Sequence, residues 1–206
     1  MQTFEITLPA MEICHLYVSS GHNFVGHHGR EPDTYPMIEV PMIDCRAGRG
    51  VRADRYFDFK NGDYKGQITF FSLEVFDELC RALRIHECSP ALARRNVITR
   101  GADLNSLIGE EFEMQGVRFF GTEECRPCYW MNRTFTPGAH EFLKGRGGLR
   151  AKILSDGQLR SMPSCSHPER SEGPHLQSLR YSTGERDPSA CKRFLTSLGM
   201  TIETPA

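Results

Sequence analysis

Hydrophobic residues in the first 160 positions fall into short runs that are separated by Gly, Pro, Asp and Asn. β-Branched and aromatic residues are frequent in these runs, which is typical of strands bounded by turns. The sequence predicts strands or strand pairs at residues 35–45, 65–72, 94–101, 109–125 and 149–159. Gln115-Gly116, inside the fourth run, predicts a hairpin turn.

One segment, residues 72–85, has a helical pattern instead. Leu73, Phe76, Leu79 and Leu83 recur at helical spacing, and Ser72 is a suitable N-cap. Shorter helical turns are expected in the sequences SPALARR (89–95) and DLNSLIG (103–109). Many short strands with one dominant helix favour a mainly β fold, a barrel or sandwich, over repeated βαβ units.

The composition changes near Arg160. The following stretch is rich in Ser, Pro, Gly and charged residues and has no hydrophobic periodicity. Such a segment buries too little apolar surface to offset the entropy cost of ordering it. The sequence therefore predicts three parts: an N-terminal extension at 1–34, a β-barrel domain at 35–160, and a poorly structured, flexible tail at 161–206.

Charge and cysteine usage narrow the class of protein. Lys and Arg total 25 against 26 Asp and Glu, so no net charge favours nucleic acid or a membrane surface. No apolar run is long enough to span a bilayer, and the N-terminus lacks the pattern of a signal peptide. We expect a soluble, cytoplasmic protein with free thiols.

Four of the eight cysteines have apolar neighbours or lie at segment ends, which predicts packing roles: Cys14, Cys45, Cys80 and Cys88.

Cys125 and Cys128 form a Cys-x-x-Cys pair beside Arg126 and the only tryptophan, Trp130. The spacing suits half of a zinc site, a redox dithiol, or one thiolate that binds a larger ligand. A zinc site needs two more ligands, and no second Cys or His pair has suitable spacing. A redox dithiol of the thioredoxin type is expected to open a helix in a βαβ unit, whereas this pair follows a predicted hairpin. Spacing alone leaves these interpretations open, together with two thiols that simply pack.

The order of segments around the pair adds a resemblance. Arg94-Arg95-Asn96-Val97, then Leu107-Ile108-Gly109, then Cys125-Arg126-Pro127-Cys128 follow one another in the chain. This order resembles the MOSC family, named for the C-terminal domain of molybdenum cofactor sulfurases. The resemblance covers roughly residues 35–160, and it implies a compact, closed β-barrel with a few short helices.

The ligand that the resemblance implies is the molybdenum cofactor (molybdopterin), a pterin dithiolene that holds molybdenum and ends in a phosphate. It implies Cys128 as the catalytic thiolate and metal ligand, since a thiolate suits this metal. It also implies that Arg94 and Asn96 bind the pterin and that Ser72 lies nearby at a helix N-terminus. Arg126 would favour a neighbouring thiolate. Ordinary structural roles are the alternatives: Arg94 as a solvated charge, Asn96 as a turn residue and Ser72 as a helix cap.

Two glycine-containing segments remain. His22, His27 and His28 lie among glycines in residues 20–32, where a metal site, a loop over the cofactor with a histidine proton donor, and a purely structural loop are the alternatives. The Gly145–Gly148 segment lacks the Lys-Ser/Thr of a phosphate-binding loop, and we expect a plain turn there.

From the length of this sequence we expect no additional pyridoxal phosphate, flavin or iron–sulfur domain. The resemblance therefore implies a stand-alone protein that reduces N-hydroxylated small molecules with electrons from protein partners. A non-enzymatic carrier is the first alternative, with Cys128 holding sulfur as a persulfide or holding the cofactor. A zinc-stabilised interaction module that uses Cys125 and Cys128 is the second.

Overall fold

The computed structural model describes residues 11–24 and 31–162. The predictions for His27, His28 and nearly all of the C-terminal tail therefore lie outside the described residues. The strands are β1 (Glu12–Val18), β2 (Ile38–Glu39), β3 (Met42–Arg46), β4 (Gly50–Val51), β5 (Ile68–Ser72), β6 (Val97–Arg100), β7 (Glu111–Met114), β8 (Val117–Glu124), β9 (Leu149–Ile153) and β10 (Gly157–Arg160). The helices are α1 (Leu73–Ala82), α2 (Trp130–Thr134) and α3 (Ala139–Phe142), with 3-10 turns η1 (Phe59–Gly62), η2 (Pro90–Ala93) and η3 (Leu104–Leu107).

The strands form two sheets, which confirms the mainly β prediction. The larger sheet has the order β2-β1-β6-β5-β9-β8-β7, and the smaller one has the order β10-β3-β4. Only β5 and β6 pair in parallel, and all other named pairs in the described residues are antiparallel. The closed barrel that the resemblance implies is not found as a continuous ring of paired strands in this part of the chain.

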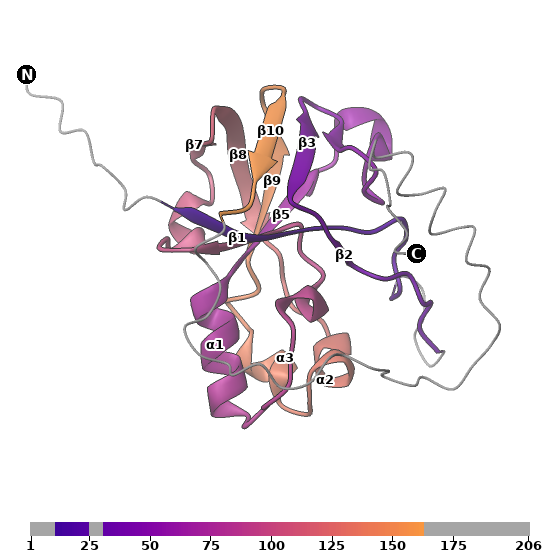
Figure 1. Ribbon diagram of the computed structural model, residues 1–206, viewed down its shortest axis with the longest axis vertical. Coiled ribbons are helices and arrows are strands. Elements are labelled where there is room, and N and C mark those ends of the chain that lie inside the picture. The colour runs from indigo at the N-terminus through magenta and orange to yellow at the C-terminus, as the bar shows by residue number, and fades with distance from the viewer. Residues whose placement is uncertain (1–10, 25–30, 163–206) are drawn as a thin grey trace, which may run out of the picture. The chain divides into compact units, whose positions relative to one another are not determined.

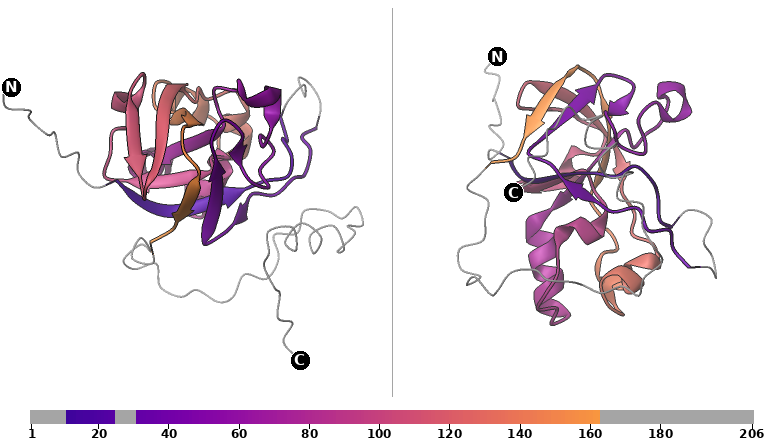
Figure 2. Two further views of the ribbon diagram at one scale, coloured as in Figure 1. Left: turned by 90° about the horizontal axis from the view of Figure 1, so that it is seen from above. Right: turned by 45° about the vertical axis from the view of Figure 1, so that its right-hand side comes forward.

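Side-chain hydrogen bonds link the two sheets where strand pairing does not. β10 pairs with β3 and also lies near β8 (Figure 2). At its end, the backbone N–H of Arg160 donates to Gln115 Oε1 at 2.8 Å, and Gln115 Nε2 donates to the Arg160 carbonyl at 2.9 Å. Gln115 lies in the β7–β8 turn, so the small sheet is fastened to the edge of the large one.

The β7–β8 hairpin has the predicted turn. Gln115 (φ 49°) and Gly116 (φ 79°) both have positive φ, as the two central residues of a type I′ turn require. The expected helical turns at 89–95 and 103–109 are the 3-10 turns η2 and η3.

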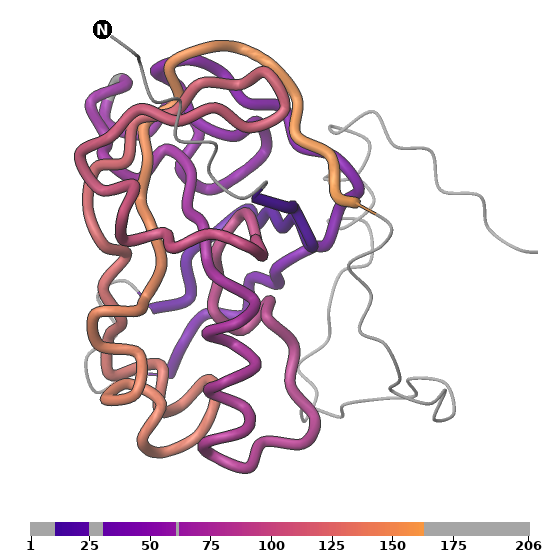
Figure 3. Tube along the Cα trace, turned by 90° about the vertical axis from the view of Figure 1, so that its left-hand side faces the viewer, coloured from indigo at the N-terminus to yellow at the C-terminus, as the bar shows by residue number. Residues whose placement is uncertain are grey.

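Helix α1 begins where the sequence predicts. Ser72 is its N-cap, and Ser72 Oγ accepts a hydrogen bond from the Val75 N–H at 3.2 Å. Leu73, Phe76 and Leu79 are buried on one face. This face packs against the sheet and against α2 and α3 in one core cluster (Figures 1 and 3). The helices therefore gather on one side of the strands.

Strand β1 is the main element that the sequence analysis missed. Its residues fall in the predicted N-terminal extension, yet β1 pairs with β2 and β6 inside the large sheet. Five of its seven residues are buried, on both faces of the strand, so no polar–apolar alternation marks it. The division of the chain into parts at 1–34, 35–160 and 161–206 remains a prediction.

Three of the four predicted packing cysteines, Cys14, Cys45 and Cys80, are buried, and Cys88 is half-buried. Burial raises the pKa of the Cys45 thiol to about 12, which keeps it protonated. No disulfide joins these four cysteines within the described residues.

Candidate functional site

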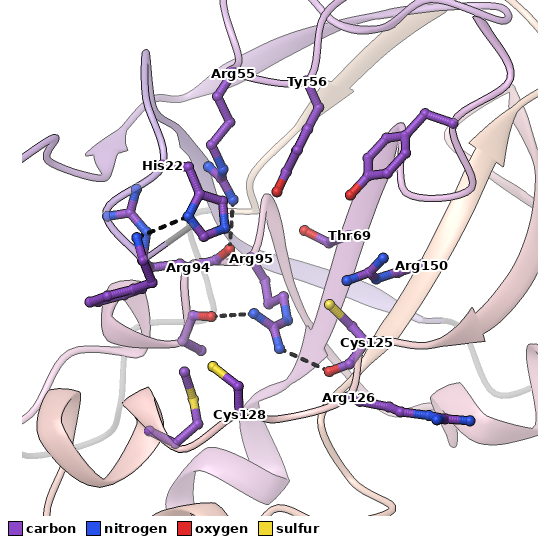
Figure 4. Close-up of a pocket in the computed structure, with 14 residues that line it drawn as sticks. His22, Arg55, Tyr56, Thr69, Arg94, Arg95, Cys125, Arg126, Cys128 and Arg150 are labelled. Atoms are coloured by element: carbon purple, nitrogen blue, oxygen red, sulfur yellow. Dashed lines mark hydrogen bonds between the residues drawn. The ribbon is translucent and has the colours of Figure 1, made fainter. Parts of the chain in front are cut away.

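Cys125 and Cys128 line one cavity of about 180 Å³ (Figure 4). Its walls come from segments far apart in the sequence: the loop after β1, the turn after β4, the starts of β5 and β6, the loop after β8, and β9. The lining residues are His22, Phe24, Arg55, Tyr56, Tyr64, Thr69, Ala93, Arg94, Arg95, Cys125, Arg126, Cys128, Met131 and Arg150.

The cysteine loop is held in place by the Gly145–Gly148 turn. Cys125 N–H donates to the Gly148 carbonyl at 2.7 Å. A Cβ at Gly147 would lie 2.4 Å from the Cys125 carbonyl oxygen, so only glycine allows the two segments to pass this closely. The expected plain turn is therefore part of the wall that positions the loop.

Arg95 reinforces the same contact. Its Nη2 donates to the carbonyls of Cys125 at 2.9 Å and Gly147 at 3.1 Å, and its Nη1 donates to Ala93 at 2.6 Å. The side chain is buried, and its hydrogen bonds within the described residues all go to backbone carbonyls. Arg95 thus fixes the loop and adds positive charge to the cavity.

The two cysteines lie in different environments. Cys125 is buried, with 5% of its surface exposed, whereas Cys128 is exposed. Neither forms a disulfide with another cysteine in the part of the chain that the structure describes. Cys125 lies against Arg150 (Figure 4), and although burial acts to lower the pKa of Arg150, the interaction with Cys125 raises it. Cys128 is therefore the thiol that a ligand reaches more easily.

Arg94 is buried in the cavity wall and holds the loop after β1. Its Nη1 donates to the Tyr35 carbonyl at 2.9 Å, and its Nη2 donates to Ser19 Oγ at 3.2 Å and to the Gly21 carbonyl at 2.9 Å. Its Nε has no partner in the part of the chain that the structure describes. Burial, followed by the charge of Arg55, lowers the pKa of Arg94 to about 10.

Arg55 lies beside Arg94 and is the one lining arginine with a buried carboxylate. Its Nη1 lies 3.3 Å from Asp54 Oδ1, and its Nη2 donates to the Arg94 carbonyl at 3.0 Å. Asp54 also accepts the Ser19 N–H at 3.1 Å. This carboxylate therefore both organises the backbone and balances one guanidinium group.

Positive charge exceeds negative charge around the cavity. The lining residues include five arginines and no carboxylate. Within the described residues, Asp54 pairs with Arg55, and Glu123 lies 3.5 Å from Arg150. No ion pair is found there for Arg94, Arg95 or Arg126. Because charge removed from water is costly without a counter-ion, this arrangement favours an anionic ligand.

Two predicted cofactor contacts lie outside the cavity lining. Asn96 is almost fully buried, and its Oδ1 accepts from Thr69 N at 3.1 Å and Thr69 Oγ1 at 2.9 Å, while its Nδ2 donates to Tyr17 at 3.3 Å. It thereby connects β1, β5 and the start of β6. Ser72 Oγ caps α1 and donates to Glu74 Oε2 at 2.7 Å. The pterin contacts predicted for both side chains remain predictions without support from the cavity geometry.

The structure places Arg94, Arg126 and Cys128 in the lining of one cavity and adds residues that sequence reasoning missed. Among these are Arg55, Tyr56, Tyr64 and Arg150. They come from separate segments without a shared motif, so only the fold places them together. The rings of Tyr56 and Tyr64 are tilted by 35° with centroids 4.8 Å apart, and burial raises the pKa of Tyr64.

A sequence model of the MOSC domain matches residues 54–161, which is more than half of the 206 residues. The chain belongs to the MOSC domain family. The match includes five of the six lining segments and both cysteines, but it begins after the loop that carries His22 and Phe24.

Solved structures with MOSC-type folds are similar to this chain. The YuaD protein from Bacillus subtilis is 17% identical with a TM-score of 0.55, over 73% of this chain and 92% of that protein. YiiM from Geobacillus stearothermophilus is 11% identical with a TM-score of 0.53, over 73% of this chain and 71% of that protein. These likenesses show the fold. No curated protein matches the chain significantly.

None of the helices in the described residues has the length and apolar character needed to cross a bilayer.

Proposed function

We propose that this MOSC protein binds the molybdenum cofactor in the cavity and reduces N-hydroxylated compounds with electrons from partner proteins. One observation carries the proposal: an exposed thiol, Cys128, lines the same cavity as an arginine cluster that lacks matching carboxylates. The cofactor combines a soft metal centre with a phosphate, and a thiolate and arginines are the groups that suit these two parts.

The donor set fits this ligand class. Arg126 and Arg150 would attract the anionic part, and Cys128 would be the protein ligand to molybdenum. A cavity of about 180 Å³ is smaller than the ~300–1,000 Å³ of pockets that enclose a drug-sized ligand. The cavity therefore suits one end of the cofactor, with the remainder towards its mouth.

The bound cofactor would supply a two-electron redox centre. Reduction of an N-hydroxylated compound consumes two electrons and two protons, cleaves the N–O bond, and releases water and the amine. The chain's own residues would bind the ligand, orient it and hold it with fixed positive charge. The electrons would come from an electron-transfer protein.

Exposure of Cys128 also favours the carrier alternative, in which this thiol holds sulfur as a persulfide. A zinc-stabilised module has less support, because the described residues contain no group of three His, Cys, Asp or Glu side chains that could hold a metal ion.

The test compares Cys128→Ser with Cys125→Ser after purification from a molybdenum-replete host. We expect Cys128→Ser to abolish reduction of an N-hydroxylated test compound with a chemical electron donor, since a serine hydroxyl is not ionised near neutral pH. Cys125→Ser is expected to be much milder. Equal loss in both variants would contradict Cys128 as the sole thiolate ligand, and full activity of Cys128→Ser would exclude it. Sulfane sulfur without molybdenum would favour the carrier.

A further inference from the structure

His22 lies in the loop after β1 and lines the cavity opposite the cysteines (Figure 4). Its Nδ1 accepts a hydrogen bond from the Phe24 backbone N–H at 3.0 Å. A neutral imidazole has one donor and one acceptor nitrogen, so this bond places the hydrogen on Nε2. Figure 4 shows the second ring nitrogen on the opposite edge of the ring, on the side of Arg55.

The ring is held in this orientation by aromatic neighbours. Its centroid lies 6.3 Å from that of Phe24 and 6.1 Å from that of Tyr56, and both contacts are edge-on. Tyr56 and Phe24 also line the cavity. The imidazole is therefore packed on two sides and hydrogen-bonded on a third, which leaves the Nε2 edge for a ligand.

The charge around His22 keeps it neutral. Burial, together with the charges of Arg55, Arg94, Arg95 and Arg150, lowers the pKa of His22 to about 4. A neutral Nε2–H is a weak acid, so this group is better suited to donating a hydrogen bond than to supplying a proton. At neutral pH the Nε2–H of His22 can thus donate a hydrogen bond to a ligand but cannot accept one.

We propose that His22 is a specificity-determining residue that donates its Nε2–H to an oxygen of an anionic, phosphate-type ligand in this cavity. The arginines attract the anion by charge, and His22 selects ligands that present an acceptor oxygen at its position over ligands that present a hydroxyl or amine donor. Where that ligand is the cofactor phosphate, the inference rests on the proposed function. His22 lies outside the MOSC match, so the donor belongs to the N-terminal part of this chain.

The other explanation is that His22 only closes the loop through Phe24. Two variants separate these roles. In His22→Asn, the shorter side chain can still accept the Phe24 N–H, because Asn commonly bonds the backbone two residues ahead, but the Nε2 donor is lost. In His22→Phe, ring packing is kept and both hydrogen bonds are lost. His15→Asn is the matched control, since His15 Nδ1 pairs with Glu39 at 2.7 Å outside the cavity lining.

The experiment is calorimetric titration with inorganic phosphate at pH 7.5 and low salt, on full-length protein. We expect His22→Asn and His22→Phe to weaken phosphate binding at least roughly tenfold, the effect of losing one hydrogen bond to a charged group, and His15→Asn to match wild type. Wild-type affinity in His22→Asn with loss only in His22→Phe would overturn the inference, and so would a wild type that does not bind phosphate.

A nitrogen-15 NMR spectrum of the histidine rings gives a second readout. The inference requires the Nε2–H tautomer at pH 7.5 and a change of the His22 Nε2 resonance when phosphate is added. A protonated Nδ1 would overturn it.

Metal analysis of the same preparations distinguishes this inference from the proposed function. Phosphate binding that depends on His22 in a protein without molybdenum supports this inference alone, whereas a molybdenum-containing protein with full phosphate affinity in His22→Asn supports only the proposed function.

Discussion

Two arginine-rich regions of this protein differ in how their charges are balanced. At the small sheet and its turn, three arginines face exposed or half-exposed aspartates: Arg46 and Asp156 at 3.0 Å, Arg49 and Asp58 at 2.6 Å, and Arg52 and Asp44 at 3.5 Å. In the cavity, buried arginines donate mainly to backbone carbonyls. The nearly equal totals of 25 basic and 26 acidic residues in the whole chain thus conceal a local excess of positive charge.

The difference has an energetic meaning. Exposed ion pairs contribute little to stability because water and salt screen them, and Arg49 holds the pKa of Asp58 below its usual range without burying either group. Buried guanidinium groups without counter-ions are costly, as the lowered pKa of Arg94 indicates. A fold that keeps such a cluster beside an accessible thiol is suited to an anion that supplies the missing charge.

The largest expected effect comes from Arg94→Ala. The loss of three hydrogen bonds from a charged donor, each contributing ~1.5–3 kcal/mol, is expected to lower the free energy of unfolding by at least about 3 kcal/mol. Arg49→Ala, at the small sheet, should change stability little. Urea denaturation of both variants checks this prediction. Similar decreases in the free energy of unfolding of the two variants would show that the two regions contribute equally to stability.

A smaller effect is expected from adding phosphate. A ligand at a hundred times its dissociation constant stabilises the folded state by about 2.7 kcal/mol. We expect thermal unfolding of wild type and of Arg46→Gln to shift upward with phosphate, and Arg150→Gln to lose most of the shift. If Arg46→Gln, at the small sheet, also loses the phosphate-induced rise in melting temperature, the proposed difference between the two regions is contradicted.

The smallest effect is a pH dependence from His22. The unfolded chain takes up a proton at His22 near pH 6.5, whereas the folded chain does so only near pH 4. Between these values the unfolded state binds more protons, so the free energy of unfolding falls as pH falls through this window. His22→Asn removes this contribution, and its stability should decrease less steeply from pH 6.5 to 4. Parallel pH profiles for both proteins would show that His22 is not held neutral.

Local features of the fold were predictable because short-range rules determine them. Ser72 caps α1 through a bond three residues ahead, and Gln115-Gly116 turns a hairpin that needs positive φ. The ordered motifs around Cys128 identified the family. Strand β1 was not predictable, because burial on both faces removes the alternation that marks a strand.

The site was only partly predictable. Arg94, Arg126 and Cys128 carry the resemblance and do line the cavity. Arg55 and Arg150 are not part of a recognisable sequence motif. Their positions in the cavity wall follow from contacts between segments that are far apart in the sequence. Asn96 shows the opposite case: its position in the motif suggests a ligand contact, but its side chain joins three strands. A motif residue can thus support the site through the fold alone.

The most direct test of the account is the molybdenum and pterin content of wild type, Arg150→Gln and Arg46→Gln, purified in parallel from a molybdenum-replete host. Both variants remove one arginine, one from the cavity and one from the small sheet. The account predicts molybdenum near one atom per chain, with pterin, in wild type and Arg46→Gln, and a much lower content in Arg150→Gln. Equal content in the two variants, or no molybdenum in wild type, would contradict it.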